Sequence, residues 1–367
     1  MNTVLQILNL AGSLGLFLYG MTLMSESLQK VAGDRLRGFL ASMTSNSFKR
    51  VLTGLFITAV IQSSSATTVM VVSFVNAGLL SLAQAIGVIM GANIGTTVTA
   101  WLVSLLGFKA DISILSIPLI ALGFILTMSK RQKRKNIGEM VIGFALLFLG
   151  LTFMKESVPD LRSSPETLAF LQSLTDWGFW STLIFVGIGT VLTIVLQSSS
   201  ATMALTLVMV NFGWIPFEMA AALVLGENIG TTVTANIAAS VGNVSAKRAA
   251  LAHTFFNLIG VTWVLILFKP VLKLVGVIIT GLGAADPFIP VTQAADPEAS
   301  SVAMLYAVSL LHTLFNVTNT LLLVGFTPLL VKVVTYVIKN PKEEEKFRLK
   351  FIQGGLLSTA ELSLDQA

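Results

Sequence analysis

Two polar runs of identical sequence interrupt the apolar stretches of this chain and contain its most distinctive functional groups. The first is Gln62-Ser63-Ser64-Ser65-Ala66-Thr67, and the same six residue types return at 197–202. Each run is followed 29 positions after its first residue by a second polar cluster, at 91–100 and at 226–235. Aligned without a gap, 62–100 and 197–235 share 19 of 39 residues, so the chain contains an internal duplication.

The four clusters combine the groups that an anion and a hard cation need together. Amides freed at a helix break, with the positive end of a half-helix dipole, favour an anion. Carbonyl, amide and hydroxyl oxygens favour a cation such as sodium, and Ser and Thr hydroxyls serve either ligand. No Lys or Arg lies within the clusters, so bound sodium would supply the positive charge that an oxyanion needs. The clusters predict an oxyanion site that also binds sodium, without other cofactors or a transition metal.

Composition predicts an all-α integral membrane protein with the lipid bilayer as its surroundings. Of the 367 residues, 54% are apolar and 11% are charged, whereas roughly 25% of the residues in a soluble domain are charged. The apolar segments are continuous for about 20 residues, the length that a helix needs to cross a bilayer. The chain has no Cys, which excludes disulfides and thiolate metal ligands. Basic residues lie in short stretches between the apolar segments, which argues against nucleic acid as a partner.

The position of the clusters within the apolar segments predicts helix breaks. Backbone groups freed in a bilayer need partners, and a run of hydrogen-bonding side chains can provide them. We therefore expect re-entrant hairpins at 51–76 and 181–211, each formed by two half-helices that meet at the serines. Discontinuous helices, interrupted at their Gly and Asn residues, are expected at 82–106 and 217–240. Further spans are expected at 4–24, 112–128, 137–154, 250–268 and 302–326, which gives seven crossings in all.

Loop charges predict the orientation of these crossings. Residues 130–135 include five basic side chains and 30–50 include five more, and loops of this kind face the cytoplasm. The N-terminus is then outside, the tail 339–367 is cytoplasmic, and the chain is a multi-pass protein of the cell (inner) membrane. Three crossings separate the opening helices of the two copies, so the repeats are expected to have inverted topology. The predicted organisation is repeat 1 at 1–136, repeat 2 at 137–275, an extracellular loop and last transmembrane helix at 276–338, and the tail.

The paired motifs resemble the type II sodium/phosphate cotransporter family over roughly residues 5–335. The resemblance implies a symporter of inorganic phosphate and sodium that works by alternating access through a central site. It implies phosphate contacts from Gln62, Ser63, Ser64, Ser65, Thr97, Gln197, Ser198, Ser199, Ser200 and Thr232. It implies sodium contacts from Gln62, Ser65, Asn93, Thr96, Gln197, Ser200, Asn228, Thr231 and Thr234.

Glu227 is the one acidic residue within the polar clusters. A carboxylate inside a membrane segment is expected to be functional, and it could ligate sodium, carry a proton, or sit protonated and hydrogen-bonded. We favour a role at a sodium site. His253 and His312 each begin a His-Thr-x-Phe-Asn sequence, and hydrogen-bonded helix contacts are the favoured interpretation for both.

Several functions stay open at this point. The carrier could move another oxyanion such as sulfate, it could act in export, or the protein could be an anion channel. An enzyme is not expected, because no Ser/His/Asp set, metal cluster or nucleotide-binding loop is present and the serines lack a matched base. The oligomeric state is open as well, with a dimer as one option.

Overall fold

The computed structural model describes residues 3–32, 46–109, 112–157 and 173–340, and every regular element in these ranges is a helix, which confirms the all-helical class. In the first half of the chain the elements are α1 (Thr3–Ala32), α3 (Ser47–Ile61), α4 (Ser64–Asn76), α5 (Leu82–Leu102), the π-helical η1 (Val103–Lys109), the 3-10 helical η2 (Ile112–Leu115), α6 (Ser116–Thr127) and α7 (Gln132–Ser157). In the second half they are α9 (Phe179–Leu196), α10 (Ser199–Asn211), α11 (Phe217–Ser240), α12 (Val244–Ile266), α13 (Phe268–Gly281), α14 (Pro297–Val324) and α15 (Thr327–Val337).

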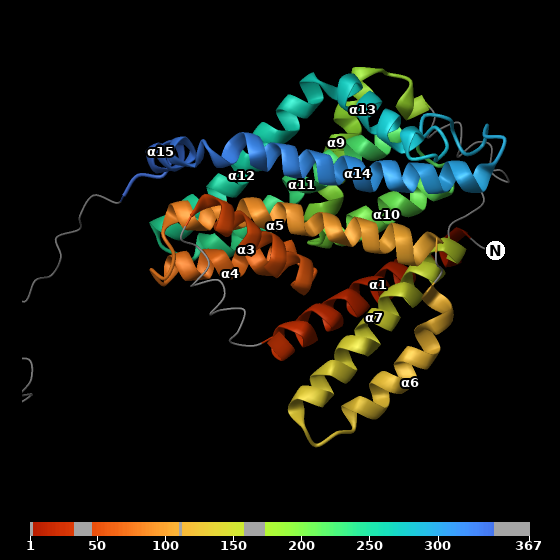
Figure 1. Ribbon diagram of the computed structural model, residues 1–367, viewed down its shortest axis with the longest axis horizontal. Coiled ribbons are helices and arrows are strands. Elements are labelled where there is room, and N and C mark those ends of the chain that lie inside the picture. The colour runs from red at the N-terminus through yellow and green to blue at the C-terminus, as the bar shows by residue number, and fades with distance from the viewer. Residues whose placement is uncertain (1–2, 33–45, 110–111, 158–172, 341–367) are drawn as a thin grey trace, which may run out of the picture.

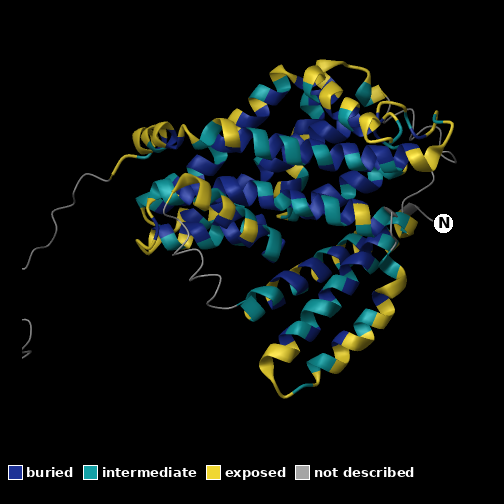
Figure 2. Ribbon diagram, viewed as in Figure 1, coloured by how far each residue is buried: buried dark blue, intermediate teal, exposed yellow. Residues whose placement is uncertain are grey.

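The helices pack in pairs around a buried centre. α1 lies along α7, and α6 packs against α7 as well (Figure 1). α3 packs along α5 and α9 along α11, while α14 runs beside α5 across the molecule. Figure 2 shows α5, α11 and α14 mostly buried, whereas α6 and α15 expose much of their surface. The two long helices that carry the second polar clusters therefore form part of the core.

The duplicated sequence adopts the same local structure twice. Gln62 caps the C-terminus of α3 and Gln197 caps that of α9, and both residues adopt the left-handed conformation, with φ of 59° and 51°. Such angles are uncommon for residues other than glycine. Ser63 and Ser198 then extend, with φ of −146° and −149°, before α4 and α10 begin. The expected break at each serine run is present in both copies.

The prediction of discontinuous helices at 82–106 and 217–240 is wrong. Both α5 and α11 continue without interruption through their Gly, Asn and Thr residues. The glycines instead allow close packing, because a Cβ on Gly91 would collide with the carbonyl of Val51 in α3, and one on Gly226 would collide with the carbonyl of Val186 in α9. Small residues allow membrane helices to approach closely in this way.

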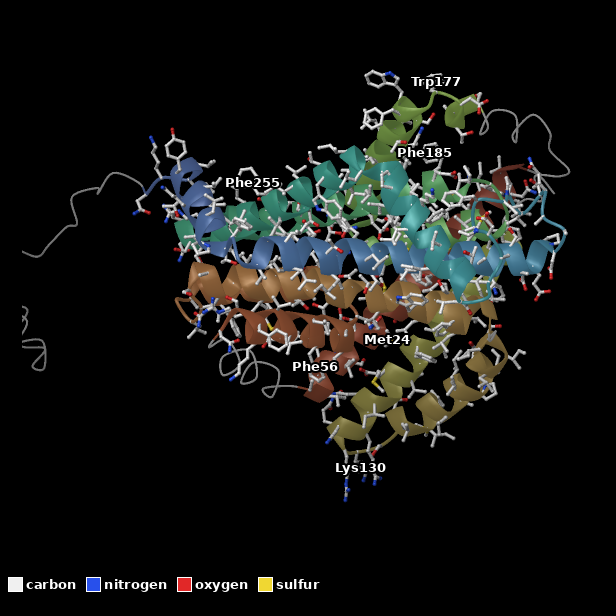
Figure 3. All side chains as sticks on the ribbon, turned by 45° about the horizontal axis from the view of Figure 1, so that its top comes forward. Met24, Phe56, Lys130, Trp177, Phe185 and Phe255 are labelled. Atoms are coloured by element: carbon white, nitrogen blue, oxygen red, sulfur yellow. The ribbon has the colours of Figure 1, made fainter. Side chains whose placement is uncertain are left out.

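The helix boundaries differ from the predicted spans. By length and composition, six described helices could cross a membrane, at 4–32, 82–108, 132–157, 179–196, 244–266 and 297–324. This set includes α9, which belongs to one of the expected hairpins, and leaves out α11 and the shorter α6, which are two of the seven expected crossings. α13 was not predicted at all. Lys130, in the basic segment, extends outward near the turn between α6 and α7 (Figure 3). The tail beyond residue 340 and the loop at 158–172 lie outside the described residues.

Candidate functional site

Each helix break places a polar helix N-terminus at the serine run. The Ser63 hydroxyl accepts a hydrogen bond from the amide of Ala66 at 3.2 Å, and the Ser198 hydroxyl accepts one from the amide of Ala201 at 3.2 Å. A helix provides no carbonyl partner for its first amides. The two serine amides that follow each capping serine are therefore the groups that can bind an anion.

The two glutamines at the breaks lie in different environments. Gln62 is 8% exposed, its Oε1 accepts a hydrogen bond from the Thr99 hydroxyl of α5 at 3.0 Å, and its Nε2 donates to the Ala59 carbonyl at 2.5 Å. Gln197 is exposed. The Gln62 side chain therefore ties the first break to α5, whereas the Gln197 side chain is accessible to a ligand.

The second clusters keep their polar side chains bonded within α5 and α11. Asn93 and Asn228 donate from Nδ2 to the carbonyls of Ile89 and Val224, at 2.9 Å and 2.7 Å. The hydroxyls of Thr96, Thr97, Thr231 and Thr232 likewise donate to carbonyls three or four residues earlier in their helices. Each of these polar side chains therefore has a hydrogen-bond partner on its own helix. These bonds also leave the oxygens, and not the N–H or O–H groups, as the atoms available to a ligand, which suits a cation.

The fold brings the two copies together through helix packing. α4, which follows the first serine run, packs against α11 of the second copy, and α10 packs against α5 of the first. Ser64, Ser199 and Ser200 are buried, and Ser63, Ser65, Ser198 and Thr234 are half-buried. Among the described residues, the hydrogen bonds of the serine, glutamine, asparagine and threonine side chains predicted for the site stay within one copy.

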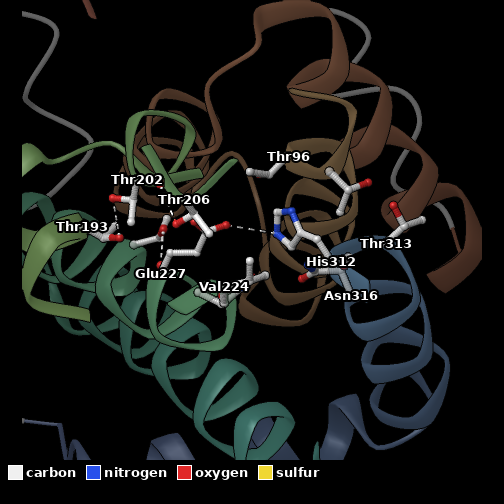
Figure 4. A network of polar contacts seen from close by, with 12 residues as sticks. Thr96, Thr193, Thr202, Thr206, Val224, Glu227, His312, Thr313 and Asn316 are labelled. Atoms are coloured by element: carbon white, nitrogen blue, oxygen red, sulfur yellow. Dashed lines mark hydrogen bonds and ion pairs between the residues drawn. The ribbon is translucent and has the colours of Figure 1, made fainter. Parts of the chain in front are cut away.

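Glu227 and His312 are close together, and sequence reasoning missed this contact. Glu227 is 0% exposed, and its Oε1 lies 3.7 Å from Nε2 of His312 in α14. Neither carboxylate oxygen has a hydrogen-bond partner. Figure 4 shows the carboxylate of Glu227 directed at the imidazole, with Thr202 and Thr206 of α10 on its other side. The repeated His-Thr-x-Phe-Asn pattern is present in the sequence, but it does not indicate which helix His312 faces.

Two further observations limit the chemistry of the site. A cavity of about 210 Å³ next to Gln62 is lined otherwise by apolar residues of α1, α6 and α7. Within the described ranges, no group of three or more His, Cys, Asp or Glu residues could hold a metal ion. The side-chain oxygens of the clusters in α5 and α11 are ligands of the kind that hard cations prefer.

Comparison with known proteins places the chain in a family. The family model described as Na+/Pi-cotransporter matches residues 16–156 and 166–285. Protein YqeW of Bacillus subtilis is 34% identical over 252 residues, which cover 68% of this chain and 78% of that protein. The protein named "Putative inorganic phosphate export protein YjbB" of Salmonella typhimurium is 27% identical over 366 residues, which are 99% of this chain but only 62% of the relative. Sodium-dependent phosphate transport protein 2A of Rattus norvegicus is 37% identical over 107 residues, 28% of this chain and 16% of that protein.

No solved structure matches the chain. The family model nevertheless covers both copies of the duplicated motifs, and it describes transporters, not enzymes. The long apolar helices are those of a multi-pass membrane protein, as such a family requires. The chain belongs to the Na+/Pi-cotransporter family.

Proposed function

We propose that this chain is a secondary active transporter that moves inorganic phosphate together with sodium across the cell (inner) membrane by alternating access. The observation that carries the proposal is the pair of matching helix breaks at Gln62 and Gln197. Backbone groups freed inside a membrane cost several kcal/mol each unless they are satisfied. A break that is kept twice, with the same dihedral angles and the same caps, supports a role in ligand binding.

In this proposal the serine runs bind phosphate. The free amides at the N-termini of α4 and α10 carry partial positive charge and point their hydrogens away from the helix, which suits an oxyanion. The serine hydroxyls add donors, since each can donate to a phosphate oxygen. The clusters hold no basic side chain that would neutralise phosphate, so the remaining charge must be balanced by another ligand.

Sodium is the ligand that balances this charge. The amide oxygens of Asn93 and Asn228 are available because their Nδ2 groups are bonded within the helix. A bound cation lowers the electrostatic cost of desolvating the anion, and the anion in turn strengthens binding of the cation. This mutual effect is reciprocal by thermodynamic linkage, and it is what couples the two gradients in a symporter.

The lengths of the helices that follow the two breaks support re-entrant hairpins, which we propose lie within inverted repeats. α4 and α10 have 13 residues each, which at 1.5 Å per residue extends to about 20 Å. The hydrocarbon core of a bilayer is about 30 Å thick, so neither helix is long enough to cross it. We propose that each break turns the chain back, with the N-terminus outside and the C-terminal tail in the cytoplasm.

Purified protein in liposomes provides the test. Uptake of radiolabelled phosphate is measured with an inward sodium gradient and with an equal potassium gradient. We expect saturable accumulation that depends on sodium. Uptake that neither saturates nor responds to sodium would indicate a channel, and a lack of phosphate uptake by folded protein would redirect the assay to sulfate and other oxyanions.

Substitutions at the serine runs test the site itself. Ser64→Ala and Ser199→Ala each remove one buried hydroxyl next to the free amides. We expect the KM for phosphate to rise about tenfold or more in each variant, since a lost hydrogen bond to a charged group costs about 1.5–3 kcal/mol. Wild-type kinetics in both variants would contradict a phosphate site at these serines.

Phosphate export is a second candidate for the direction of transport. The observation in its favour is that YjbB of Salmonella typhimurium, which matches 99% of this chain, is named as a phosphate export protein. The same liposomes, loaded with phosphate and diluted into buffers with and without sodium, distinguish the two directions. Efflux that exceeds uptake at equal and opposite gradients would favour export.

A further inference from the structure

α12 and α14 carry the same sequence pattern and the same internal hydrogen bond. His-Thr-x-Phe-Asn occurs in α12 at 253–257 and in α14 at 312–316. In each helix the Asn side chain donates from Nδ2 to the carbonyl of the His one turn earlier, at 3.1 Å in α12 and 2.9 Å in α14. The two helices thus present an imidazole and an amide oxygen at equivalent positions.

These two helices also make equivalent contacts with the duplicated part of the chain. Thr254 of α12 accepts a hydrogen bond from Asn236 of α11 at 2.8 Å, and Thr313 of α14 accepts one from Trp101 of α5 at 2.9 Å. Asn236 and Trp101 occupy corresponding positions when the two copies are aligned. α14 therefore contacts α5 in the way that α12 contacts α11. In the sequence, however, α14 follows both copies of the duplicated segment.

One residue breaks this symmetry. α14 also packs against α11, where His312 lies close to Glu227. The residue of α5 that aligns with Glu227 is Ala92. Both oxygens of Glu227 are buried and without a hydrogen-bond partner. Oδ1 of Asn316 is in the same situation. Its Nδ2 is committed to the His312 carbonyl, so the oxygen is the atom left for a ligand.

We propose that Glu227 and Asn316 are ligands of one sodium ion at the contact of α11 with α14, and that His312 positions the carboxylate. His312 and Asn316 lie one turn apart on α14, and Figure 4 shows the imidazole of His312 facing the Glu227 carboxylate, with Asn316 beside His312. Ionisation of a carboxyl group in a low-dielectric interior requires a compensating charge, which a bound cation would supply, and carboxylate and amide oxygens are the ligands that hard cations prefer. The proposal rests on the proposed function only for the role of this ion in transport.

The equivalent contact, between α12 and α5, is not expected to bind a cation in this way. Asn257 of α12 also has a buried Oδ1 without a partner, but the methyl group of Ala92 stands where the carboxylate would be. Within the described residues, we therefore expect one carboxylate-based sodium site of this kind, in spite of the duplication. Asn257 is in consequence a matched control for Asn316.

Equilibrium binding of radiolabelled sodium to the purified full chain in detergent tests the site without phosphate or transport. Potassium and choline salts are used to hold the ionic strength constant. We expect Glu227→Gln and Asn316→Ala to lose one sodium per chain, or to weaken its binding about tenfold or more, as the loss of a charge-assisted contact predicts. Asn257→Ala should bind sodium within about twofold of wild type, a difference well under 1 kcal/mol.

Asn316→Asp separates a ligand from a structural side chain. It keeps an oxygen at this position but removes the Nδ2 donor to the His312 carbonyl, which is the bond that Asn316→Ala also removes. A ligand role predicts that Asn316→Asp retains sodium binding, and a purely structural role predicts that it fails like Asn316→Ala. If Asn316→Ala does not elute as a folded protein, Asn316→Asp and Glu227→Gln still test the site.

The site and the proposed function can fail separately. Wild-type sodium affinity in Glu227→Gln, or equal losses in Asn316→Ala and Asn257→Ala, would overturn the site even if phosphate uptake depends on sodium. Conversely, loss of one sodium in Glu227→Gln alongside sodium-independent uptake by the wild type would support the site and reject sodium coupling.

Discussion

Replacing Gly230 with Ala should destabilise the protein, while replacing Gly187 with Ala should stabilise it slightly. Both glycines lie within helices of the same packed pair, Gly230 in α11 and Gly187 in α9. A Cβ on Gly230 would lie 2.6 Å from the Thr190 carbonyl oxygen and 2.6 Å from the Thr193 Cβ. A Cβ on Gly187 would have no atom within 4 Å. The two substitutions therefore make the same chemical change with and without a steric clash.

The expected magnitudes follow from this contrast. Alanine in a helix interior is more favourable than glycine by up to about 1 kcal/mol, and this gain applies to both positions. At Gly230 the helices must separate by several tenths of an ångström, and overpacking of this kind costs about 1–3 kcal/mol. The difference between the two variants thus isolates the packing cost and should be about 1–3 kcal/mol, because the helix propensity cancels.

Thermal unfolding of the purified variants in detergent measures this difference. For proteins of 150–250 residues, 1 kcal/mol shifts Tm by about 2–4 °C, so Gly230→Ala should melt clearly below Gly187→Ala. Gly230→Ala should also reduce phosphate uptake, since it displaces the helix that carries Glu227. Equal melting temperatures, or a more stable Gly230→Ala, would refute the argument that this glycine is required for close helix packing.

Two further predictions concern the first break and the orientation of the chain. Thr99→Val removes the donor to the buried Gln62 carboxamide and should lower the free energy of unfolding by about 1–3 kcal/mol, the cost of a buried acceptor left unsatisfied. Unchanged thermal unfolding would show that this bond does not hold the break in place. Since the chain has no native Cys, single cysteines can be introduced as Asp176→Cys and Gln132→Cys and labelled in sealed cells. A membrane-impermeant maleimide should reach position 176 only. Labelling of both positions from the same side would contradict the inverted topology.

Much of the local structure was predictable because it depends on neighbouring residues. The breaks at Gln62 and Gln197 follow from serines that cap the next helix through an amide three residues later, and such contacts lie within one turn of the chain. The duplication required only alignment. The all-helical class followed from the length of the apolar segments. The backbone of a segment that spans a membrane must form its hydrogen bonds within the segment, which a helix allows.

The effect of the second polar clusters on their helices was not predictable from neighbouring residues. Gly91, Asn93 and Gly95 are consistent with a broken helix if only the local sequence is considered. The carbonyl of Val51, which a Cβ on Gly91 would strike, belongs to a different helix. Whether a glycine breaks a helix or allows a second helix to pack closely depends on what lies against it, and that is a property of the fold.

The sequence by itself determined that this chain is a duplicated, helical membrane protein with two polar breaks, since composition, periodicity and capping act over a few residues. Only the tertiary structure decided which polar residues meet. Glu227 and His312 are 85 positions apart, and their contact depends on α14 packing against α11. A buried carboxylate acquires its chemistry from the groups that surround it, and long-range helix packing selects those groups.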